Sequence, residues 1–558
     1  MRQEHFSAFI IKNNKKSLIF CGVGSLEFDY VIVGAGSAGC AIAARLSENP
    51  SVSVALIEAG GRDRSPWIHI PVGYFKTIKN PALNWMYRTQ ADPGLNGRAL
   101  NWPRGKTLGG SSSINGLLYV RGQAQDYDHW RQLGNPGWAW TDVLPLFKRS
   151  ENWEGGASDM RGGDGPLSVT KSRKSWKIVD AWVKAAQNAG YPYNPDYNGE
   201  DQSGVGYFQL TARNGLRCSS AKAYLAPNKG RKNLEIITHV LTEKVLFDGK
   251  RATGIQGSRK GQPITIKARN EVVLSAGAIG SPQILMLSGI GPSAQLGEHG
   301  IDVLHASAGV GKNLQDHLQA RPVYKCSVPS INTRTRGLWN QAKIAMEYAL
   351  KKTGPMTMAA SLGTGYLKTR PELETPDIQF HIQPFSADNP TTGTHTFDAF
   401  TASVLQMRPE SAGELLLKSA NPNDHPAIHP NYLATQLDQE TIVEGIRIAR
   451  RICRQSPVAD VITEEHAPGK LIADDDYDAL LDWARNTATT IYHPTGTCRM
   501  GPDSDRKAVV DARLRVKGAT NLRVADCSIM PQIVSGNTNA PAIMIGERVS
   551  DMIREDAR

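Results

Sequence analysis

The chain has 558 residues, of which 40% are hydrophobic and 21% are charged, and its mean hydropathy is −0.35. This composition excludes a disordered chain and a protein with many membrane spans, and the length allows several domains with a large core. Lysine and arginine outnumber aspartate and glutamate by 64 to 53, so the net charge is +11 and is spread along the chain. We therefore expect no nucleic-acid partner, while a weak peripheral contact with an anionic membrane surface stays open.

The seven cysteines are sparse and form no C-x-x-C pair, which predicts neither a disulfide framework nor a zinc site. We accordingly expect no metal ion and a reducing, cytoplasmic compartment, with the inner membrane as the place of any peripheral contact. Residues 1–27 hold charged residues and a short apolar run, but no small-residue cleavage site follows. Two interpretations stay open for this segment: a disordered or over-long N-terminal extension, which we favour, and a targeting segment.

The first ordered pattern is a strand, a glycine-rich turn, a helix and a second strand, in FDYVIVGAGSAGCAIAARL and VSVALIEAG. Gly34, Gly36 and Gly39 form the pattern G-x-G-x-x-G, whose glycines allow the tight turn, the approach of a pyrophosphate and close helix packing. Glu58 lies 24 positions after Gly34 at the end of the second strand, where a carboxylate can accept the hydroxyls of a ribose. The unit predicts a dinucleotide-binding βαβ domain, and an ordinary glycine-rich turn is the weaker alternative.

The patterns that follow predict more than one domain. Residues 61–110 are broken by prolines and predict long loops over a site. Strand patterns between residues 234 and 276 predict a meander that returns to the first sheet. Residues 317–490 contain PDIQFHIQPF, FTASVLQMRP and the helical DQETIVEGIRIARRICRQ, which predict an antiparallel sheet backed by helices. The C-terminal NTNAPAIMIGERVSDMI predicts a closing helix.

Taken together, these elements predict an α/β chain (α+β overall). A discontinuous, Rossmann-like nucleotide-binding domain is expected from residues 28–150, 231–316 and 491–558. A substrate-binding domain, built on an antiparallel sheet backed by helices, is expected from residues 151–230 and 317–490.

Four further segments have the composition of site loops. Residues 105–116, GKTLGGSSSING, suit a loop along a cofactor, although a flexible linker has a similar composition. Residues 277–291 predict a helix that opens at Ser281 and Pro282, although a plain strand-to-helix turn would look the same. Residues 492–501 and 535–541 are polar loops near the C-terminus. His493 lies there between the predicted domains, where catalytic residues concentrate, although a lone histidine is more often structural.

With these motifs in this order, the sequence resembles the glucose–methanol–choline family of FAD-dependent oxidoreductases over about residues 28–554. The motifs that carry the resemblance are GAGSAG with IEAGG, GKTLGGSSSINGLLYVRG, GAIGSPQILMLSGIG, and HPTGTCRMG with DCSIMPQIVSGNTNAPAIMIGE. Within the family the sequence is most similar to bacterial choline-dehydrogenase-like alcohol dehydrogenases. The resemblance implies FAD as cofactor and a small alcohol as substrate, oxidised to the aldehyde by hydride transfer to flavin N5.

The resemblance also implies the roles of individual residues. The residues implied to hold FAD are Gly34, Gly36, Ser37, Ala38, Gly39, Glu58, Ala59, Gly109, Gly110, Ser111, Asn115, Gly116, Val240, Asp526 and Asn537. His493 is implied as the catalytic histidine with Asn537 as its partner, and Gln319 and Tyr492 are implied to line the substrate pocket. Ile114 stands where some relatives carry a histidine bonded to the flavin, so the FAD is expected to be non-covalent.

The implied chemistry is physically consistent. A primary alcohol can release hydride only if a base takes its hydroxyl proton. A neutral histidine, whose ordinary pKa is about 6.5, could be that base while Asn537 donates a hydrogen bond to the alkoxide. A helix that opens near Asn539 could place its positive end beside the reduced flavin. Gln319 stands where choline-specific relatives carry a glutamate, which disfavours choline and favours a neutral primary alcohol.

Several alternatives stay open at this point. Within the family these are choline dehydrogenase proper, a lyase that cleaves cyanohydrins and a light-driven decarboxylase. Outside it they are a redox-inactive flavin-binding scaffold and an NAD-dependent dehydrogenase, which would leave three of the four motifs unexplained. The sequence favours a quinone or another carrier over O2 as electron acceptor and gives no indication of the oligomeric state.

Overall fold

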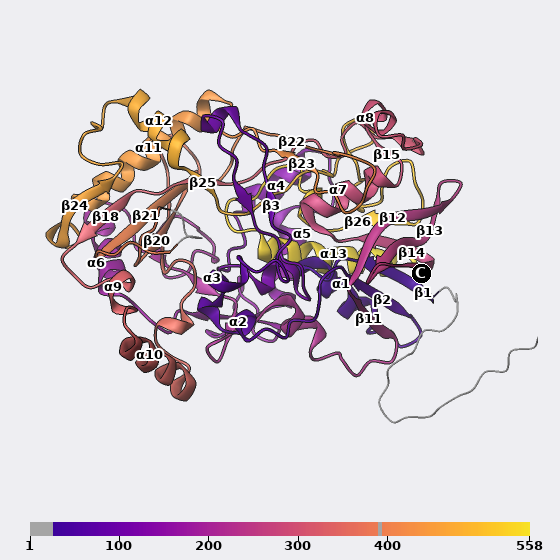
Figure 1. Ribbon diagram of the computed structural model, residues 1–558, viewed down its shortest axis with the longest axis horizontal. Coiled ribbons are helices and arrows are strands. Elements are labelled where there is room, and N and C mark those ends of the chain that lie inside the picture. Colours follow the sequence, from indigo (N-terminus) through magenta and orange to yellow (C-terminus); the bar gives the residue numbers. More distant parts are fainter. Residues whose placement is uncertain (1–25, 389–392) are drawn as a thin grey trace, which may run out of the picture.

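Two sheets organise the chain, and they lie side by side along the long axis of the molecule (Figure 1). The computed structural model describes residues 26–388 and 393–558. A mixed sheet of seven strands has the order β11-β2-β1-β14-β13-β12, with β26 beside β14. The antiparallel sheet has eight strands. This arrangement confirms the predicted α/β class with a Rossmann-like unit and a second, antiparallel sheet.

The mixed sheet takes its strands from three distant parts of the chain. These strands are β1 (Leu26–Val33), β2 (Val54–Glu58), β11 (Leu234–Thr238), β12 (Val240–Asp248), β13 (Arg251–Arg259), β14 (Gln262–Leu274) and β26 (Leu522–Val524). The central strands are apolar runs such as VALIE in β2, which is buried along its whole length. Continuous runs of this kind are typical of parallel strands that are covered on both faces.

Strand β1 begins two residues before the expected start at Phe28. Leu26 and Glu27 pair with β14, because that strand is 13 residues long and continues past the expected start of β1. The last two residues of the expected N-terminal extension therefore belong to the sheet. Residues 1–25 of that extension lie outside the described residues.

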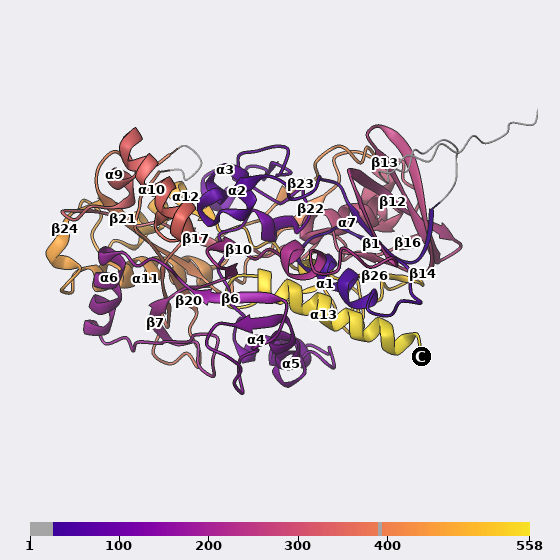
Figure 2. The ribbon, with the colours of Figure 1, turned by 90° about the horizontal axis from the view of Figure 1, so that it is seen from below.

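The turn between β1 and helix α1 (Ser37–Leu46) requires glycine. Gly34 has a φ of +101°, and a Cβ there would lie 2.4 Å from the carbonyl oxygen of Ser275. Helix α13 (Asn539–Asp556) packs along α1, as Figure 2 shows, and Arg45 of α1 donates to both carboxylate oxygens of Glu547 at 2.8 and 3.0 Å. The C-terminal helix therefore packs on the first βαβ unit, while the domain boundaries given above stay a prediction.

The antiparallel sheet is enclosed by helices. Its strands are β7 (Gly204–Tyr207), β17 (Leu318–Ala320), β18 (Val323–Cys326), β19 (Gly363–Leu367), β20 (Ile378–Gln383), β21 (Ala399–Gln406), β24 (Ile462–Ala467) and β25 (Thr489–Thr490). Helix α11 (Gln436–Cys453) packs against β21, and α6 (Lys177–Asn188) packs against β19. Every residue of β20 and β21 is buried, so the polar side chains of these strands lie inside the molecule.

The remaining helices and strands lie outside the two large sheets. The other α-helices are α2 (Pro66–His69), α3 (Tyr74–Thr77), α4 (Ala124–Gln132), α5 (Trp140–Ser150), α7 (Gly277–Leu287), α8 (Ser293–Glu298), α9 (Ile331–Arg334), α10 (Leu338–Lys351) and α12 (Tyr477–Thr487). The minor strands are β3 (Tyr87–Arg88), β4 (Asn101–Trp102), β5 (Glu151–Trp153), β6 (Leu167–Lys171), β8 (Gln209–Leu210), β9 (Ala212–Arg213), β10 (Leu216–Arg217), β15 (Ile290–Gly291), β16 (His305–Ala306), β22 (Glu414–Leu416) and β23 (Ala427–His429). Across the two described ranges, no helix is both long and apolar enough to cross a bilayer.

A buried ion cluster joins the loops beside the mixed sheet. Glu151 and Arg121 are both fully buried, and their closest nitrogen and oxygen atoms lie 2.5 Å apart. Arg161 contacts the other oxygen of Glu151 at 2.6 Å and Asp196 at 2.7 Å. The carboxylate of Glu151 therefore contacts two buried arginines, and Asp196 supplies the second negative charge of the cluster.

Loss of this carboxylate is expected to destabilise the fold strongly. Glu151→Gln leaves Arg121 without an anion, and breaking a buried pair in this way costs about 3–5 kcal/mol. Glu372→Gln is the control, because Glu372 is 69% exposed beside Arg370 and its loss should change stability by less than about 0.5 kcal/mol. Urea unfolding of the two variants measures both values, and equal midpoints would contradict the expectation.

Candidate active site

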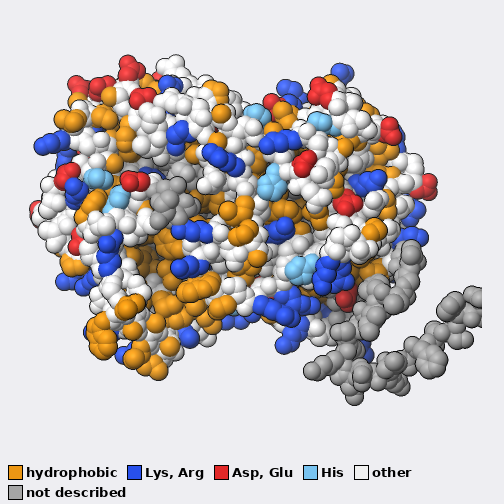
Figure 3. Space-filling view, in the orientation of Figure 1, with side chains coloured by type: hydrophobic (Ala, Val, Ile, Leu, Met, Phe, Trp, Pro, Cys, Tyr) orange, Lys and Arg blue, Asp and Glu red, His pale blue; other side chains and the backbone are white. Residues whose placement is uncertain are grey.

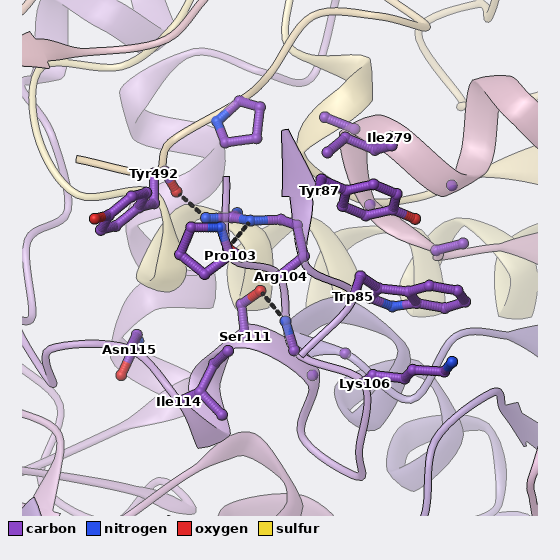
Figure 4. Close-up of a pocket in the computed structure, with 18 of the residues that line it drawn as sticks. Trp85, Tyr87, Pro103, Arg104, Lys106, Ser111, Ile114, Asn115, Ile279 and Tyr492 are labelled. Carbon is purple, nitrogen blue, oxygen red and sulfur yellow. Dashed lines mark hydrogen bonds between the residues drawn. The ribbon is translucent and has the colours of Figure 1, made fainter. Parts of the chain in front are cut away.

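A cavity of about 660 Å³ is lined by residues from both parts of the molecule (Figure 4). The predicted site residues on its wall are Gly34, Gly36, Ser37, Ala38, Glu58, Ala59, Gly110, Ser111, Asn115, Gly116, Val240, Gln319, Tyr492, His493, Asp526 and Asn537. The structure does not place Gly39 and Gly109 on this wall. Gly39 packs inside α1 against the carbonyl of Gly34, and the Gly109 N–H donates to the carbonyl of Ala35 at 2.8 Å. These two glycines therefore stabilise the turn and the loop without lining the cavity.

The end of the cavity beside β1 and β2 fits the adenosine and pyrophosphate of FAD. A Cβ at Gly36 would meet no atom nearer than 3.8 Å, so the cavity is open over the start of α1, where backbone N–H groups can bind phosphate. Glu58 accepts the N–H of Ala35 at 3.1 Å and of Gly60 at 2.8 Å, and its other lone pairs can accept ribose hydroxyls. Burial raises the pKa of Glu58 to about 7. A buried carboxylate that faces a cavity suits a ligand rich in hydroxyl donors.

The loop of residues 105–116 is held rigidly, which excludes the flexible-linker alternative. Arg217 is buried and donates to the backbone carbonyls of Ser112 and Asn115 at 3.1 and 2.7 Å, and to the side chain of Asn115 at 2.6 Å. Ile114 is 3% exposed and packs in a small cluster with Ile68 and Leu83. Figure 4 shows Ser111, Ile114 and Asn115 along one wall of the cavity.

Helix α7 begins at Gly277, four residues before the expected start. Asp526 explains the earlier start, because its Oδ2 accepts the Gly277 N–H at 2.8 Å and the Ser281 hydroxyl at 2.6 Å. Pro282 then lies inside the helix and cannot donate to the carbonyl of Ala278. The hydroxyl of Thr497 donates to that carbonyl instead, at 2.7 Å. Asp526 thus orders the helix start that borders the cavity.

The backbone at His493 is fixed from both parts of the molecule. Tyr492 is left-handed, with φ of +71°, a conformation that costs a non-glycine residue about 1–2 kcal/mol. Arg104 donates to the carbonyl of Tyr492, as Figure 4 shows, and the Tyr492 N–H donates to Thr490 Oγ1 at 2.7 Å. The N–H of His493 donates to Asp316 Oδ1 at 2.6 Å. These contacts hold the imidazole of His493 in one place.

The hydrogen bonds of two histidines determine which ring nitrogen of His493 is protonated. His317 Nε2 lies 2.8 Å from the carbonyl of Met407, and a carbonyl only accepts, so this nitrogen carries the proton. Burial lowers the pKa of His317 to about 4, which leaves its Nδ1 unprotonated at neutral pH. His493 Nδ1 lies 2.9 Å from that atom and must therefore donate to it. His493 Nε2 is left with a lone pair.

Asn537 contacts the free nitrogen of His493. Its Nδ2 lies 3.1 Å from His493 Nε2 and donates to it, while its Oδ1 accepts from Gln379 Nε2 at 3.4 Å. Burial and the neighbours His317, Arg104 and His381 lower the pKa of His493 well below its usual value. The site therefore presents a neutral imidazole with an accepting nitrogen beside an amide donor.

Several polar residues at the other end of the cavity were not predicted from the sequence. Arg321, Ser361, His381 and Gln383 line it, and all four are buried. The signal for His381 and Gln383 was available, because polar residues alternate in the strand pattern QFHIQ of β20 and therefore face one side. Arg321 and Arg104 gave no such signal, because an isolated arginine in a sequence is usually a surface residue.

One group of possible metal ligands lies outside the cavity wall, among the residues that the structure describes. The ligand atoms of Asp388, His395 and His466 lie within 4.8 Å of one another. Asp388 is 89% exposed and already pairs with His395 at 3.0 Å. Exposed groups of this kind are common without an ion, and the expectation of no metal stays a prediction.

The comparisons with known proteins agree with this site. The models of the family described as GMC oxidoreductase match residues 28–319 and 409–546. The chain is 42% identical to an oxygen-dependent choline dehydrogenase of Vibrio vulnificus strain YJ016 over 532 residues, 94% of each chain. It is also 42% identical to an alcohol dehydrogenase (acceptor) of Pseudomonas putida over 539 residues, 94% of this chain and 95% of that protein.

A solved structure of formate oxidase from Aspergillus oryzae RIB40, which concerns the modification of its FAD, has a TM-score of 0.87 at 28% identity. The match covers 96% of this chain and 99% of that one. The matched family segments include the glycine-rich turn and the loops at His493 and Asn537. The resemblance is thereby confirmed, and the chain belongs to the GMC oxidoreductase family, as an FAD-dependent enzyme that oxidises alcohols.

Proposed function

We propose that the protein oxidises a primary alcohol to an aldehyde, with His493 as the base that takes the hydroxyl proton. The observation that carries this proposal is the unprotonated state of His493 Nε2, which the hydrogen bond to His317 sets. Its lone pair accepts from Asn537 at the cavity wall, and the substrate hydroxyl would take that place. Bound FAD supplies the hydride acceptor. The side-chain amide of Asn537 lies beside His493 Nε2, so its N–H group can stabilise the negative charge that develops on the substrate oxygen.

The cofactor is proposed to be held without a covalent bond. Ile114 occupies the position at which a histidine would bond the flavin, and its side chain is apolar and buried against Ile68. The fixed loop of residues 105–116 and the open space over Gly36 provide binding through shape and backbone contacts instead.

The substrate is proposed to lack a cationic group. Two of the relatives are choline dehydrogenase and alcohol dehydrogenase (acceptor), so both substrate classes need to be considered. Gln319 offers a dipole where a quaternary ammonium would need an anion, and Arg321 adds a positive charge to the same wall. A proton-accepting histidine would also serve a lyase, and reduction of the flavin by an alcohol separates the two.

Removal of the base is expected to stop flavin reduction without loss of FAD. His493→Ala should slow anaerobic bleaching of the flavin by a medium-chain alkanol by about 100-fold or more. His317→Phe removes the acceptor that fixes the protonated nitrogen of His493, and we expect a loss of at least about tenfold. Stopped-flow absorbance measures both rates, and bound FAD is quantified as a control. Near-normal bleaching by FAD-loaded His493→Ala would rule out this role.

The pH dependence of flavin reduction follows from the lowered pKa of His493. The base must be neutral, and a pKa well below 6.5 keeps it neutral to lower pH, so activity is lost only as pH falls through that lower value. The rate should therefore stay on its plateau at pH 6.5. The profile is measured with FAD-saturated enzyme, because Glu58 has a pKa of about 7 and protonation there could weaken FAD binding. An acid limb centred above pH 6.5 would contradict the assignment.

The protein is further proposed to contact a membrane surface through helix α10. Leu338, Trp339, Met346 and Leu350 of this helix are between 62% and 86% exposed. Figure 3 shows hydrophobic side chains gathered at the lower left, where α10 lies in Figure 1. A row of large apolar side chains on an exposed helix is typical of helices that lie in a bilayer interface.

The charges around α10 favour an anionic bilayer as the occupant. Arg334, Arg336, Lys343 and Lys351 are exposed on or beside the helix, and Glu347 is its one acidic residue. Each basic residue near an anionic surface contributes about 1 kcal/mol of attraction. The chain then continues through the turn at Pro355–Thr357 to Ala360 and Ser361 in the cavity wall. A lipid-soluble quinone is therefore the electron acceptor that we propose.

Binding to vesicles tests this surface. The full-length protein should co-sediment with vesicles that contain phosphatidylglycerol. The double variant Trp339→Ser/Leu350→Ser should bind at least about tenfold more weakly, because it loses two exposed apolar side chains that the bilayer would bury. Leu471→Ser is the matched control, since Leu471 is 95% exposed outside α10. Equal binding by the double variant would contradict the proposal. So would a wild-type dimer that the double variant abolishes, because a second copy would then cover the helix.

A further inference from the structure

Three buried polar atoms at the end of the cavity away from the glycine-rich turn lack hydrogen-bond partners among the described residues. They are Arg321 Nε, His381 Nε2 and Gln319 Oε1. All three residues line the cavity. Buried polar atoms are nearly always paired in native proteins, so a group of unpaired ones on a cavity wall points to a ligand that pairs with them.

A chain of hydrogen bonds shows that His381 offers a donor there. Arg321 Nη2 donates to Gln383 Oε1 at 3.1 Å, which leaves Gln383 Nε2 to donate to Ser361 Oγ at 3.3 Å. Among the described residues, Ser361 Oγ contacts only Gln383 Nε2, which is a donor, and His381 Nδ1 at 3.2 Å, so its proton goes to His381 Nδ1. Burial lowers the pKa of His381 to about 3, so the ring is neutral and its one proton is on Nε2. Both Arg321 Nε and His381 Nε2 are therefore unpaired donors, whereas Gln319 Oε1 is an acceptor and takes no part in binding an anion.

The charge of Arg321 is also unbalanced. The residue is 7% exposed, and within the described ranges no carboxylate forms an ion pair with it. The groups that oppose the lowering of its pKa by burial are the phenols of Tyr492 and Tyr74. A guanidinium stays protonated in proteins, and a buried cation is costly unless an anion accompanies it. Other buried arginines are compensated: Arg121, Arg161, Arg450 and Arg523 pair with carboxylates. Within the same described ranges, Arg217 has no carboxylate but donates four hydrogen bonds to carbonyl and amide oxygens, whereas the Arg321 guanidinium donates one, to Gln383.

We propose that Arg321 and His381 form the recognition site for a carboxylate at the far end of the alcohol substrate, which makes the preferred substrate a hydroxy acid. The two unpaired donors and the unbalanced charge are the features that a carboxylate satisfies. Ser361 and Gln383 are positioning residues that fix the proton of His381. This deepens the proposed alcohol oxidation, on which it rests, and it replaces the neutral alcohol that the sequence favoured.

The spacing along β20 separates the Arg321 end of this recognition site from the base. Gln379 contacts Asn537 beside His493, and Gln383 contacts Arg321. Four residues of strand separate the two glutamines, which corresponds to about 13 Å. His381 lies between them on the same face of the strand. The hydroxyl and the carboxylate of the substrate therefore belong at opposite ends of an extended chain.

A substrate series on the wild-type holoenzyme tests the proposal without any variant. Anaerobic flavin reduction is measured with 8-hydroxyoctanoate, its methyl ester and 1-octanol. We expect kcat/KM for the acid to exceed that for each neutral compound by at least about tenfold, which is the usual range for a charge-assisted pair. Equal kcat/KM values for the acid and its methyl ester would overturn the proposal that the site recognises a carboxylate. Reduction by 1-octanol alone would overturn the inference while the proposed oxidation stands.

Variants show which residues produce the preference for the acid. Arg321→Gln should lower the ratio of kcat/KM for 8-hydroxyoctanoate to that for 1-octanol by about 10- to 100-fold, and Arg321→Lys by less. Ser361→Ala frees the proton of His381, so we expect a higher KM for the acid with little change in its kcat. Arg131→Gln, at an exposed site on α4, is the control of equal charge and should leave the ratio unchanged. An unchanged ratio in Arg321→Gln would overturn the assignment.

Binding of octanoate provides a readout that does not depend on turnover. Calorimetry should detect octanoate binding to the oxidised wild-type holoenzyme and a loss of at least about tenfold in affinity for Arg321→Gln. If octanoate binds but no alcohol reduces the flavin, the proposed oxidation fails while the carboxylate site stands. If Arg321→Gln does not fold, Arg321→Lys and the wild-type series still decide the question. Equal octanoate affinity in wild type and the folded variant would contradict the site.

Discussion

The hydrogen bond between His317 and His493 depends on both rings being neutral, and both are neutral because they are buried. If either ring were charged, both nitrogens of that contact could carry protons and would repel each other. The carbonyl of Met407, directly after β21, fixes the proton of His317, and this in turn fixes the proton of His493. The second sheet thus decides which nitrogen of a C-terminal loop can act as a base. Desolvation, which usually disfavours a catalytic charge, here selects the reactive form.

At His381, too, the neighbouring hydrogen bonds determine which ring nitrogen is protonated, but there the proton is on Nε2. There the fixed charge of Arg321 orients Gln383, the amide orients the Ser361 hydroxyl, and the hydroxyl places the proton of His381 on Nε2. His493 therefore offers a lone pair at Nε2, and His381 offers a proton at the same atom. Two neutral histidines in one cavity thus have opposite hydrogen-bonding character at Nε2, because different neighbours bind their Nδ1 atoms.

The sequence predicted the parts of the site that local patterns encode. The βαβ unit, the glycine-rich loops and His493 each belong to a short contiguous motif, and the family resemblance implies their roles. The contacts that set protonation join residues far apart in the chain: Arg104 contacts Tyr492 across 388 positions, and His317 contacts His493 across 176. A sequence also does not show that an arginine is buried. From the sequence, Arg321 could be counted only toward the net charge, and its place in the cavity wall became known from the structure.

The position of the unpaired arginine has a consequence for catalysis. Arg321 lies at the far end of the substrate and makes the same contact before and after proton removal, so its binding energy alone lowers KM and not the barrier of the chemical step. It can raise kcat only by holding the hydroxyl against His493, because an extended chain anchored at one end has few ways to misplace the other. This positioning requires a rigid wall between the two ends. Strand β20 supplies it, since all six of its residues are buried, Gln379 near its start contacts Asn537, and Gln383 four residues on contacts Arg321.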